Sequence, residues 1–242
     1  MTALPPPCLP GNVELVLFDM AGTTVDDMVD GIPLVVAAFR AAFKACCDQD
    51  VTFEQANAVR GYEKREALRQ LASATKGVAA DAVEEAEVDA LFKQFKVELD
   101  KLTGSMNTEV TGTSATYEEL RKRGVKICVG SGFPDATVKA IVDNMGWTVD
   151  AYFSSEALGA GRPDPIMVTT AMTQFGVSDP RRVVKVGDTV VDVEEGRNAG
   201  VFTVSVLTGT QPREKLEAAG PDCIIPSVAD LPKMFNWPSP SL

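Results

Sequence analysis

The stretch ELVLFDMAGTTVDD, residues 14–27, decides the fold, because its apolar run leads directly into the carboxylate of Asp19. An uninterrupted apolar run of this kind is typical of a parallel strand that is buried on both faces. The chain then turns at once through Gly22 and Thr23. We therefore expect a buried β-strand whose carboxyl end presents an acidic side chain at the edge of a sheet.

Two later apolar segments also end on a polar residue. VKICVGS, residues 125–131, ends on Ser131, and VVKVGD, residues 183–188, ends on Asp188. Helical patterns closed by glycine precede and follow these segments, and FTVSVLTG adds a further strand after Gly200. The alternation of strands and helices predicts an α/β fold with a doubly wound parallel sheet and right-handed crossovers.

Residues 29–105 depart from this alternation. They show helical periodicity, as in IPLVVAAFRAAFKACC and DAVEEAEVDALFKQFKVELDKL, and contain no convincing strand. We expect this segment to form a helical cap domain inserted after the first strand. The α/β core is then expected over residues 13–28 and 106–242, and the proline-rich residues 1–12 are expected to form a loose leader.

The overall composition excludes several classes of function. The 242 residues include 34 Asp and Glu against 23 Lys and Arg, and this net charge of −11 disfavours nucleic acid and anionic membranes as partners. The chain has no histidine, which excludes histidine bases, Ser-His-Asp triads and histidine-ligated zinc. We expect a cytoplasmic protein with reduced thiols, because there is no C-x-x-C pair, secretory signal or membrane-spanning apolar run.

The polar residues at the strand ends are expected to meet, because ligands of open α/β sheets bind outside the carboxyl ends of the strands. The residues concerned are Asp19, Ser131 and Asp188, together with Asp192 in GDTVVD and Arg162 in GRPDP. Three carboxylates around one point repel each other unless a cation neutralises them, which favours an oxygen-ligated ion such as Mg²⁺. The Ser131 hydroxyl and the Arg162 charge suit the oxygens of a phosphoryl group.

This set resembles four ordered motifs of the haloacid dehalogenase (HAD) superfamily of phosphohydrolases. Asp19 in DMAGT matches the nucleophile, Ser131 the hydroxyl of the second motif, and Arg162 the cation of the third. GDTVVD, residues 187–192, matches the acidic fourth motif. The resemblance covers nearly the whole chain and implies a Rossmann-like core with a cap, and hydrolysis through an aspartyl-phosphate.

The same resemblance implies roles for individual residues. The metal ligands it implies for Mg²⁺ are Asp19, the backbone carbonyl of Ala21, Asp188 and Asp192. The catalytic residues it implies are Asp19, Ser131, Arg162 and Lys64. The residues expected to bind the substrate are Gly22, Thr23, Gly132 and Lys64.

Three segments, DMAGTTVDD, GRPDP and VGDTVVDVEEGRNAG, look closest to the phosphonatase-like branch of this superfamily. HAD phosphatases usually carry a second Asp two residues after the nucleophile to protonate the leaving alcohol, and this chain has Ala21 there. Cleavage of a P–C bond instead requires an electron sink at the neighbouring carbon. The branch obtains that sink from an imine between a cap lysine and an aldehyde, so phosphonoacetaldehyde is the first candidate substrate.

Lys64 in RGYEKREALRQL matches the position of that cap lysine. A helix that begins just after Gly61 places Lys64 in its first turn, where the helix dipole lowers the pKa of an amine. Lys64 also shares a helical stripe with Leu68 and Leu71, which favours partial desolvation. Related caps carry Lys or Arg here merely to contact the substrate, and the histidine that phosphonatase places three residues later is Ala67 in this chain.

The sequence is also compatible with other functions. One alternative is a phosphatase of small phosphate esters such as sugar phosphates, and another is a phosphate-binding regulatory relative whose catalysis has decayed. A receiver-like phospho-acceptor domain fits the acidic cluster but not the large cap. The expected partner is a small phosphonate or phosphate ester, and the apolar residues 32–43 allow a homodimer formed through the cap.

Overall fold

The computed structural model describes residues 8–104 and 106–237. The strands of its main sheet are β1 (Leu15–Phe18), β4 (Lys126–Ser131), β5 (Ala151–Ser154), β6 (Val183–Gly187), β7 (Phe202–Val206) and β8 (Cys223–Ile225). They are parallel and lie in the order β5-β4-β1-β6-β7-β8. The strand order reverses between β1 and β6, so the carboxyl ends of these two strands lie at the switch point where α/β sheets bind ligands.

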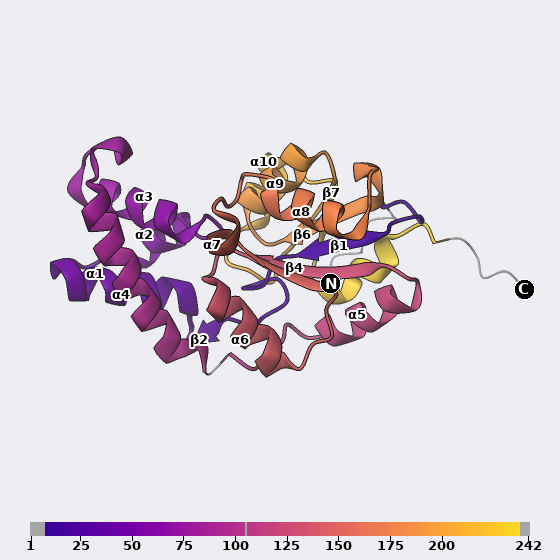
Figure 1. Cartoon of the computed structure of the whole chain (residues 1–242), viewed down its shortest axis with the longest axis horizontal. Coiled ribbons are helices and arrows are strands. Elements are labelled where there is room, and N and C mark those ends of the chain that lie inside the picture. The colour runs from indigo at the N-terminus through magenta and orange to yellow at the C-terminus, as the bar shows by residue number, and fades with distance from the viewer. Residues whose placement is uncertain (1–7, 105, 238–242) are drawn as a thin grey trace, which may run out of the picture.

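Helices cover both faces of this sheet, as Figure 1 shows. They are α5 (Thr113–Lys122) and α6 (Asp135–Met145) on one face, and α8 (Ile166–Phe175), α9 (Val190–Ala199) and α10 (Arg213–Ala219) on the other. Along β1, Val16 and Phe18 pack into one apolar cluster, whereas Leu15 and Leu17 pack into a second one. Successive side chains of a strand point to opposite faces, so β1 contributes side chains to the apolar clusters on both faces of the sheet. The predicted doubly wound α/β fold is confirmed.

Between β1 and α5 the chain forms a group of helices beyond the carboxyl edge of the sheet (Figure 1). They are α1 (Leu34–Cys47), α2 (Phe53–Ala58), α3 (Lys64–Lys76) and α4 (Glu85–Thr103), with a short 3₁₀ turn at Ala80–Ala82. Helices α1 and α4 pack through Phe39 and Phe95, whose ring centroids are 4.9 Å apart. We refer to α1–α4 and their connections as the helical insertion.

The apolar face of α1 is buried inside the chain. Leu34, Val36, Phe39 and Phe43 are fully buried, and they belong to one cluster with residues of α3 and α4. These side chains lie in the segment on which the expectation of a cap dimer rests, and they are already covered in the single chain. Dimer formation stays a prediction.

A short hairpin leads from the sheet into the helical insertion. It pairs β2 (Met28–Val29) with β3 (Ile32–Pro33), and its turn places Asp30 and Gly31 at φ values of 51° and 79°. Each of its strands has two residues, which is too short to show apolar periodicity in the sequence. The sequence pattern therefore predicts only helices in this segment.

Three short helical elements complete the part of the chain that the structure describes. They are α7 (Ser155–Leu158) and the 3₁₀ segments Pro180–Arg182 and Val228–Met234.

Residues 1–7 of the expected leader lie outside the described residues. Leu9 is fully buried, and its backbone N–H donates to the carbonyl of Met234 at 2.8 Å. Within the described ranges no helix is both long and apolar enough to span a membrane.

Candidate active site

The carboxyl ends of β1 and β6 bring Asp19 and Asp188 together at the switch point of the sheet. Asp19 directly follows β1, and its backbone N–H donates to the carbonyl of Val186 at 2.8 Å. Asp188 follows β6, and Asp192 lies in the first turn of α9. All three side chains are buried, and one carboxylate oxygen from each lies within 4.8 Å of the others. The predicted convergence of these carboxylates is confirmed.

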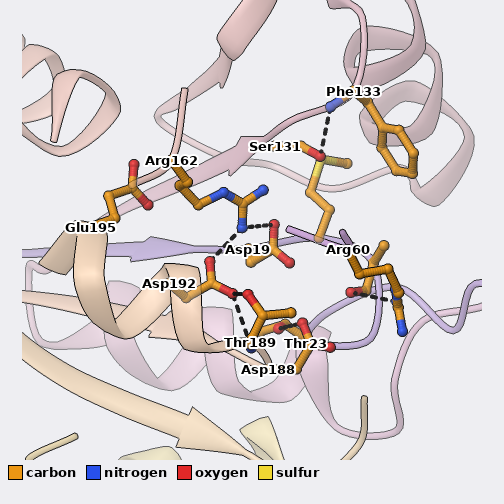
Figure 2. A network of polar contacts seen from close by, with 12 residues as sticks. Asp19, Thr23, Arg60, Ser131, Phe133, Arg162, Asp188, Thr189, Asp192 and Glu195 are labelled. Atoms are coloured by element: carbon orange, nitrogen blue, oxygen red, sulfur yellow. Dashed lines mark hydrogen bonds and ion pairs between the residues drawn. The ribbon is translucent and has the colours of Figure 1, made fainter. Parts of the chain in front are cut away.

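Arg162 lies between two of these carboxylates (Figure 2). Its Nη1 is 2.8 Å from Asp19 Oδ1 and also forms a short ion pair with Asp192 Oδ1. Burial by itself raises the pKa of Asp192, but Arg162 and Lys185 outweigh this effect and hold the pKa below its usual range. Asp192 is therefore ionised at neutral pH.

Asp188 has a different environment. Burial raises its pKa well above the usual range, Arg60 opposes this shift, and the charges of Asp19 and Asp192 add to it. Its Oδ1 accepts a hydrogen bond from Thr23 Oγ1 at 3.2 Å, whereas its Oδ2 has no hydrogen-bond partner among the residues the structure describes. A buried oxygen without a partner, in a cluster of three carboxylates, is what a hard divalent cation satisfies. This donor set fits Mg²⁺.

The Asp188 carboxylate fits into the site because two neighbouring residues, Gly22 and Gly209, have no side chain. A Cβ built on Gly22, which has φ 84°, lies 2.8 Å from Asp188 Oδ2, and a Cβ built on Gly209 lies only 1.8 Å from it. Any larger residue at either position displaces the carboxylate, and at Gly22 it also strains the backbone. Gly22 and Thr23 are thus both neighbours of Asp188, and their predicted role in substrate binding stays a prediction.

Asp192 also caps the start of α9. Its Oδ2 accepts hydrogen bonds from the backbone N–H of Thr189 at 3.1 Å and from the Thr189 hydroxyl at 2.5 Å. This is one half of a reciprocal capping box in which Thr189 is the first residue. Asp192 therefore has one oxygen bound to the helix cap and the other bound to cations, and its predicted role as a metal ligand stays a prediction.

The end of β4 supplies the hydroxyl of the site. Ser131 is buried, and its Oγ accepts a hydrogen bond from the backbone N–H of Phe133 at 3.2 Å. Gly132 lies between them, and a Cβ there would be 2.7 Å from the carbonyl oxygen of Tyr62 and 2.9 Å from Lys64 Nζ. A glycine at this position therefore lets the helical insertion approach the edge of the sheet.

Lys64 is the first residue of α3 and is only 4% exposed. Its Nζ donates a hydrogen bond to the carbonyl of Tyr62 at 2.9 Å. Burial, followed by the positive charge of Arg162, lowers the pKa of Lys64 to about 7. The predicted apolar stripe is confirmed, because Leu68 and Leu71 on the same helix are buried as well.

A small cavity of about 20 Å³ joins these groups. It is lined by Asp19, Ala21, Val35, Arg60, Gly61, Lys64, Ser131, Phe133, Arg162, Asp188 and Thr189. Such a volume holds roughly one water molecule. A lysine from the helical insertion and a carboxylate from the core therefore face one small space.

Sequence reasoning misses Arg60, which is 3% exposed. Its Nη2 lies 3.1 and 3.2 Å from the two carboxylate oxygens of Asp27 and 3.3 Å from the carbonyl oxygen of Ala21. Its Nη1 donates to the hydroxyl of Thr210 at 2.8 Å. Arg60 therefore ties the helical insertion to two loops of the core, and nothing in the sequence around it indicates these distant partners.

Lys185 and Glu195 are also absent from the sequence-based set. Lys185 lies inside β6 and is 1% exposed, with its Nζ 2.8 Å from Glu195 Oε2 and 3.2 Å from Asp192 Oδ1. Glu195, on α9, is fully buried. A lysine within the apolar run VVKVG is the signal that identifies this pair as unusual.

Comparison with known families agrees with this arrangement of carboxylates. The family model of the haloacid dehalogenase-like hydrolases matches residues 13–200, which include Asp19, Ser131, Arg162 and Asp188. This chain is a haloacid dehalogenase-like hydrolase. The hydrolase activity and the family predicted from the four motifs are confirmed.

Several relatives of this haloacid dehalogenase-like hydrolase are named phosphonoacetaldehyde hydrolase. The chain is similar to the phosphonoacetaldehyde hydrolase of Latilactobacillus sakei, with 29% identity over 259 residues, covering 93% of this chain and 95% of the relative. It is 31% identical over 208 residues to the Bacillus cereus enzyme of the same name, covering 82% and 77% of the two chains. A phosphonoacetaldehyde hydrolase-like protein from Oleispira antarctica has the same fold, with a TM-score of 0.81 at 23% identity over 96% and 93% of the chains.

Proposed function

We propose that this hydrolase cleaves the P–C bond of phosphonoacetaldehyde by transferring the phosphoryl group to Asp19. The observation that carries this proposal is the Lys64 amine, which is buried in the cavity that Asp19 also lines and has a pKa of about 7. A neutral amine is the form that attacks an aldehyde, and desolvation supplies it near neutral pH. The relatives named phosphonoacetaldehyde hydrolase support the same substrate.

Lys64 and Asp19 carry out different steps of the proposed reaction. Lys64 condenses with the aldehyde carbon, water leaves, and a protonated imine forms. Asp19 then attacks phosphorus, the P–C bond breaks, and its electron pair moves into the imine to give an enamine. Protonation of the enamine carbon and hydrolysis release acetaldehyde and the free amine, while water cleaves the aspartyl-phosphate to phosphate and restores Asp19.

The remaining polar groups stabilise charge. We assign Mg²⁺ to Asp19, the Ala21 carbonyl, Asp188 and Asp192. The bound ion supplies positive charge against the carboxylates and the phosphoryl oxygens. Arg162 and Ser131 contact the equatorial oxygens as phosphorus moves from carbon to Asp19. In this proposal, residues 29–105 act as a cap that opens to admit the substrate and closes to exclude water.

Borohydride trapping tests the imine directly. Incubation with phosphonoacetaldehyde and borohydride is expected to inactivate the enzyme and to add the reduced substrate carbon skeleton to the peptide that contains Lys64. The matched control is Lys64→Arg, which keeps the positive charge but cannot form an imine, and it is expected to give no adduct and at least a thousandfold lower kcat. Release of acetaldehyde and phosphate by Lys64→Arg at the wild-type rate would exclude the imine.

Hydrolysis of a small phosphate ester is the second candidate function. It is favoured by Ala67, which is fully buried at the position where phosphonatase carries a histidine. In this alternative Lys64 contacts the substrate only through its charge, so Lys64→Arg retains most of its activity. Phosphate release from a panel of sugar phosphates, together with no borohydride adduct, would support the ester phosphatase and not the phosphonatase.

A further inference from the structure

We propose that Lys185, held in place by Glu195, is a positioning residue of the active site that sets how Arg162 is shared between Asp19 and Asp192. This inference rests on the proposed function, in which Arg162 stabilises the transferring phosphoryl group. Neither Lys185 nor Glu195 lines the cavity, so neither touches the substrate. Lys185 acts through the carboxylate of Asp192, and Glu195 acts by holding Lys185 in place.

The contacts form a chain of alternating charges that leads from α9 to the nucleophile. Glu195 Oε2 lies 2.8 Å from Lys185 Nζ, and Lys185 Nζ lies 3.2 Å from Asp192 Oδ1. The same Asp192 oxygen is paired with Arg162 Nη1, which is 2.8 Å from Asp19 Oδ1. Figure 2 shows the end of this chain, where the guanidinium lies between the two aspartates. Asp192 Oδ1 is thus shared between two cations.

Stability alone does not explain why the charged side chains of Lys185 and Glu195 are buried. Lys185 is 1% exposed in a strand whose neighbours Val184 and Val186 are fully buried, so an apolar side chain suits the position. Removing two charges from water opposes folding, and a well-packed apolar pair of the same size is often as stable or more so. A lysine–glutamate pair here is therefore better explained by what Lys185 does to Asp192.

The direction of the effect follows from the shared oxygen. With Lys185 present, the negative charge of Asp192 is divided between an ammonium and a guanidinium. Without it, Asp192 attracts Arg162 alone and draws the guanidinium away from Asp19. The guanidinium then stabilises the charge on the phosphoryl oxygens less well, and this stabilisation is greatest in the transition state.

The double variant Lys185→Met with Glu195→Met tests this inference. It removes one cation and one anion, so the net charge of the buried cluster is unchanged and neither partner is left unpaired. We expect it to fold with a Tm within a few degrees of the wild type, with kcat at least tenfold lower and KM changed less than threefold. A folded double variant with wild-type kcat would overturn the inference, because the pair would then be purely structural.

Glu195→Gln is the second variant, because it keeps the shape of the side chain and an acceptor for Lys185. Lys185 still contacts Asp192 in this variant, so kcat is expected to stay within threefold of the wild type. A tenfold loss of kcat in Glu195→Gln would contradict a role carried by Lys185. The kcat of Glu195→Gln can be measured even if the double variant does not fold, so the inference can still be overturned.

Binding of vanadate separates this inference from the proposed function. Vanadate mimics five-coordinate phosphorus, so its affinity, measured by calorimetry with Mg²⁺ present, reports on transition-state stabilisation without turnover. We expect the double variant to bind vanadate at least tenfold more weakly and inorganic phosphate less than threefold more weakly. Equal vanadate affinity would overturn the inference whatever the substrate is. A wild-type enzyme that binds vanadate but cleaves neither phosphonoacetaldehyde nor phosphate esters would count against the proposed function alone.

Discussion

Ala21 follows the nucleophile by two residues and offers the site a backbone carbonyl but no proton. Its carbonyl oxygen accepts from Arg60 Nη2 at 3.3 Å, and the residue lines the cavity. A carboxylic acid at this position protonates a leaving alcohol, an effect typically worth about 10²–10⁴ in rate. P–C cleavage with an imine as electron sink gains nothing from such a proton.

Ala21→Asp is therefore expected to raise kcat for small phosphate esters about a hundredfold and to lower kcat for phosphonoacetaldehyde. Phosphate release from both substrate classes measures the change. Ala21→Asn is the control, because it has the same size and no acidic proton. Equal ester hydrolysis by the Asp and Asn variants would show that proton donation is not what Ala21 lacks.

The amine of Lys64 predicts a pH dependence. Because burial lowers its pKa to about 7, the neutral form that attacks the aldehyde is already half populated near neutral pH. The neutral fraction falls as the pH decreases, so kcat/KM for phosphonoacetaldehyde is expected to rise about tenfold from about pH 6 to about pH 8 and then to level off. A profile that keeps rising to about pH 10 would indicate an ordinary lysine.

At the scale of elements, the buried Arg60–Asp27 pair joins the end of α2 to the loop that follows β1. Both side chains are about 3–4% exposed, and their closest contact is 3.1 Å. Removing Asp27 takes away the nearest partner of a buried guanidinium, a kind of loss that costs about 3–5 kcal/mol. Asp27→Asn is therefore expected to lower the free energy of unfolding by about 3 kcal/mol, measured by denaturant titration.

The matched control for this pair is Arg60→Met combined with Asp27→Leu. The combined variant removes both members of the pair, although Asp188 also loses the nearby Arg60 charge, and it is expected to recover part of the lost stability. A loss below about 1 kcal/mol in Asp27→Asn would mean that the pair does not hold the two elements together.

The same elements show what sequence patterns reveal. The apolar runs before Asp19, Ser131 and Asp188 predict β1, β4 and β6, because a strand buried on both faces has a continuous pattern and a polar end. The hairpin of β2 and β3 has strands of two residues, which is too short for periodicity. The order of strands and the pairing of Lys185 with Asp192 depend on tertiary contacts, which no local pattern contains.

At the scale of the whole molecule, the cavity of about 20 Å³ is too small for phosphonoacetaldehyde. In the proposed mechanism, room for the substrate comes from movement of the helical insertion away from the sheet, and the hairpin of β2 and β3 is one connection of the insertion to the core. We expect the amides of residues 28–32 to exchange hydrogen more slowly when Mg²⁺ and vanadate hold the site closed. Hydrogen exchange followed by mass spectrometry measures this, and identical exchange with and without these ligands would contradict a moving insertion.

The proposed mechanism depends most on Asp19 as the nucleophile, and rapid acid quenching during turnover identifies the residue that carries the phosphoryl group. Mass spectrometry of the quenched wild-type enzyme is expected to find one phosphoryl group on the peptide that contains Asp19, removable by hydroxylamine as an acyl phosphate is. Asp19→Asn is expected to fold, to form no phosphorylated peptide and to release no phosphate. Rapid phosphate release by Asp19→Asn, or a phosphoryl group trapped on another residue, would exclude Asp19 as the nucleophile.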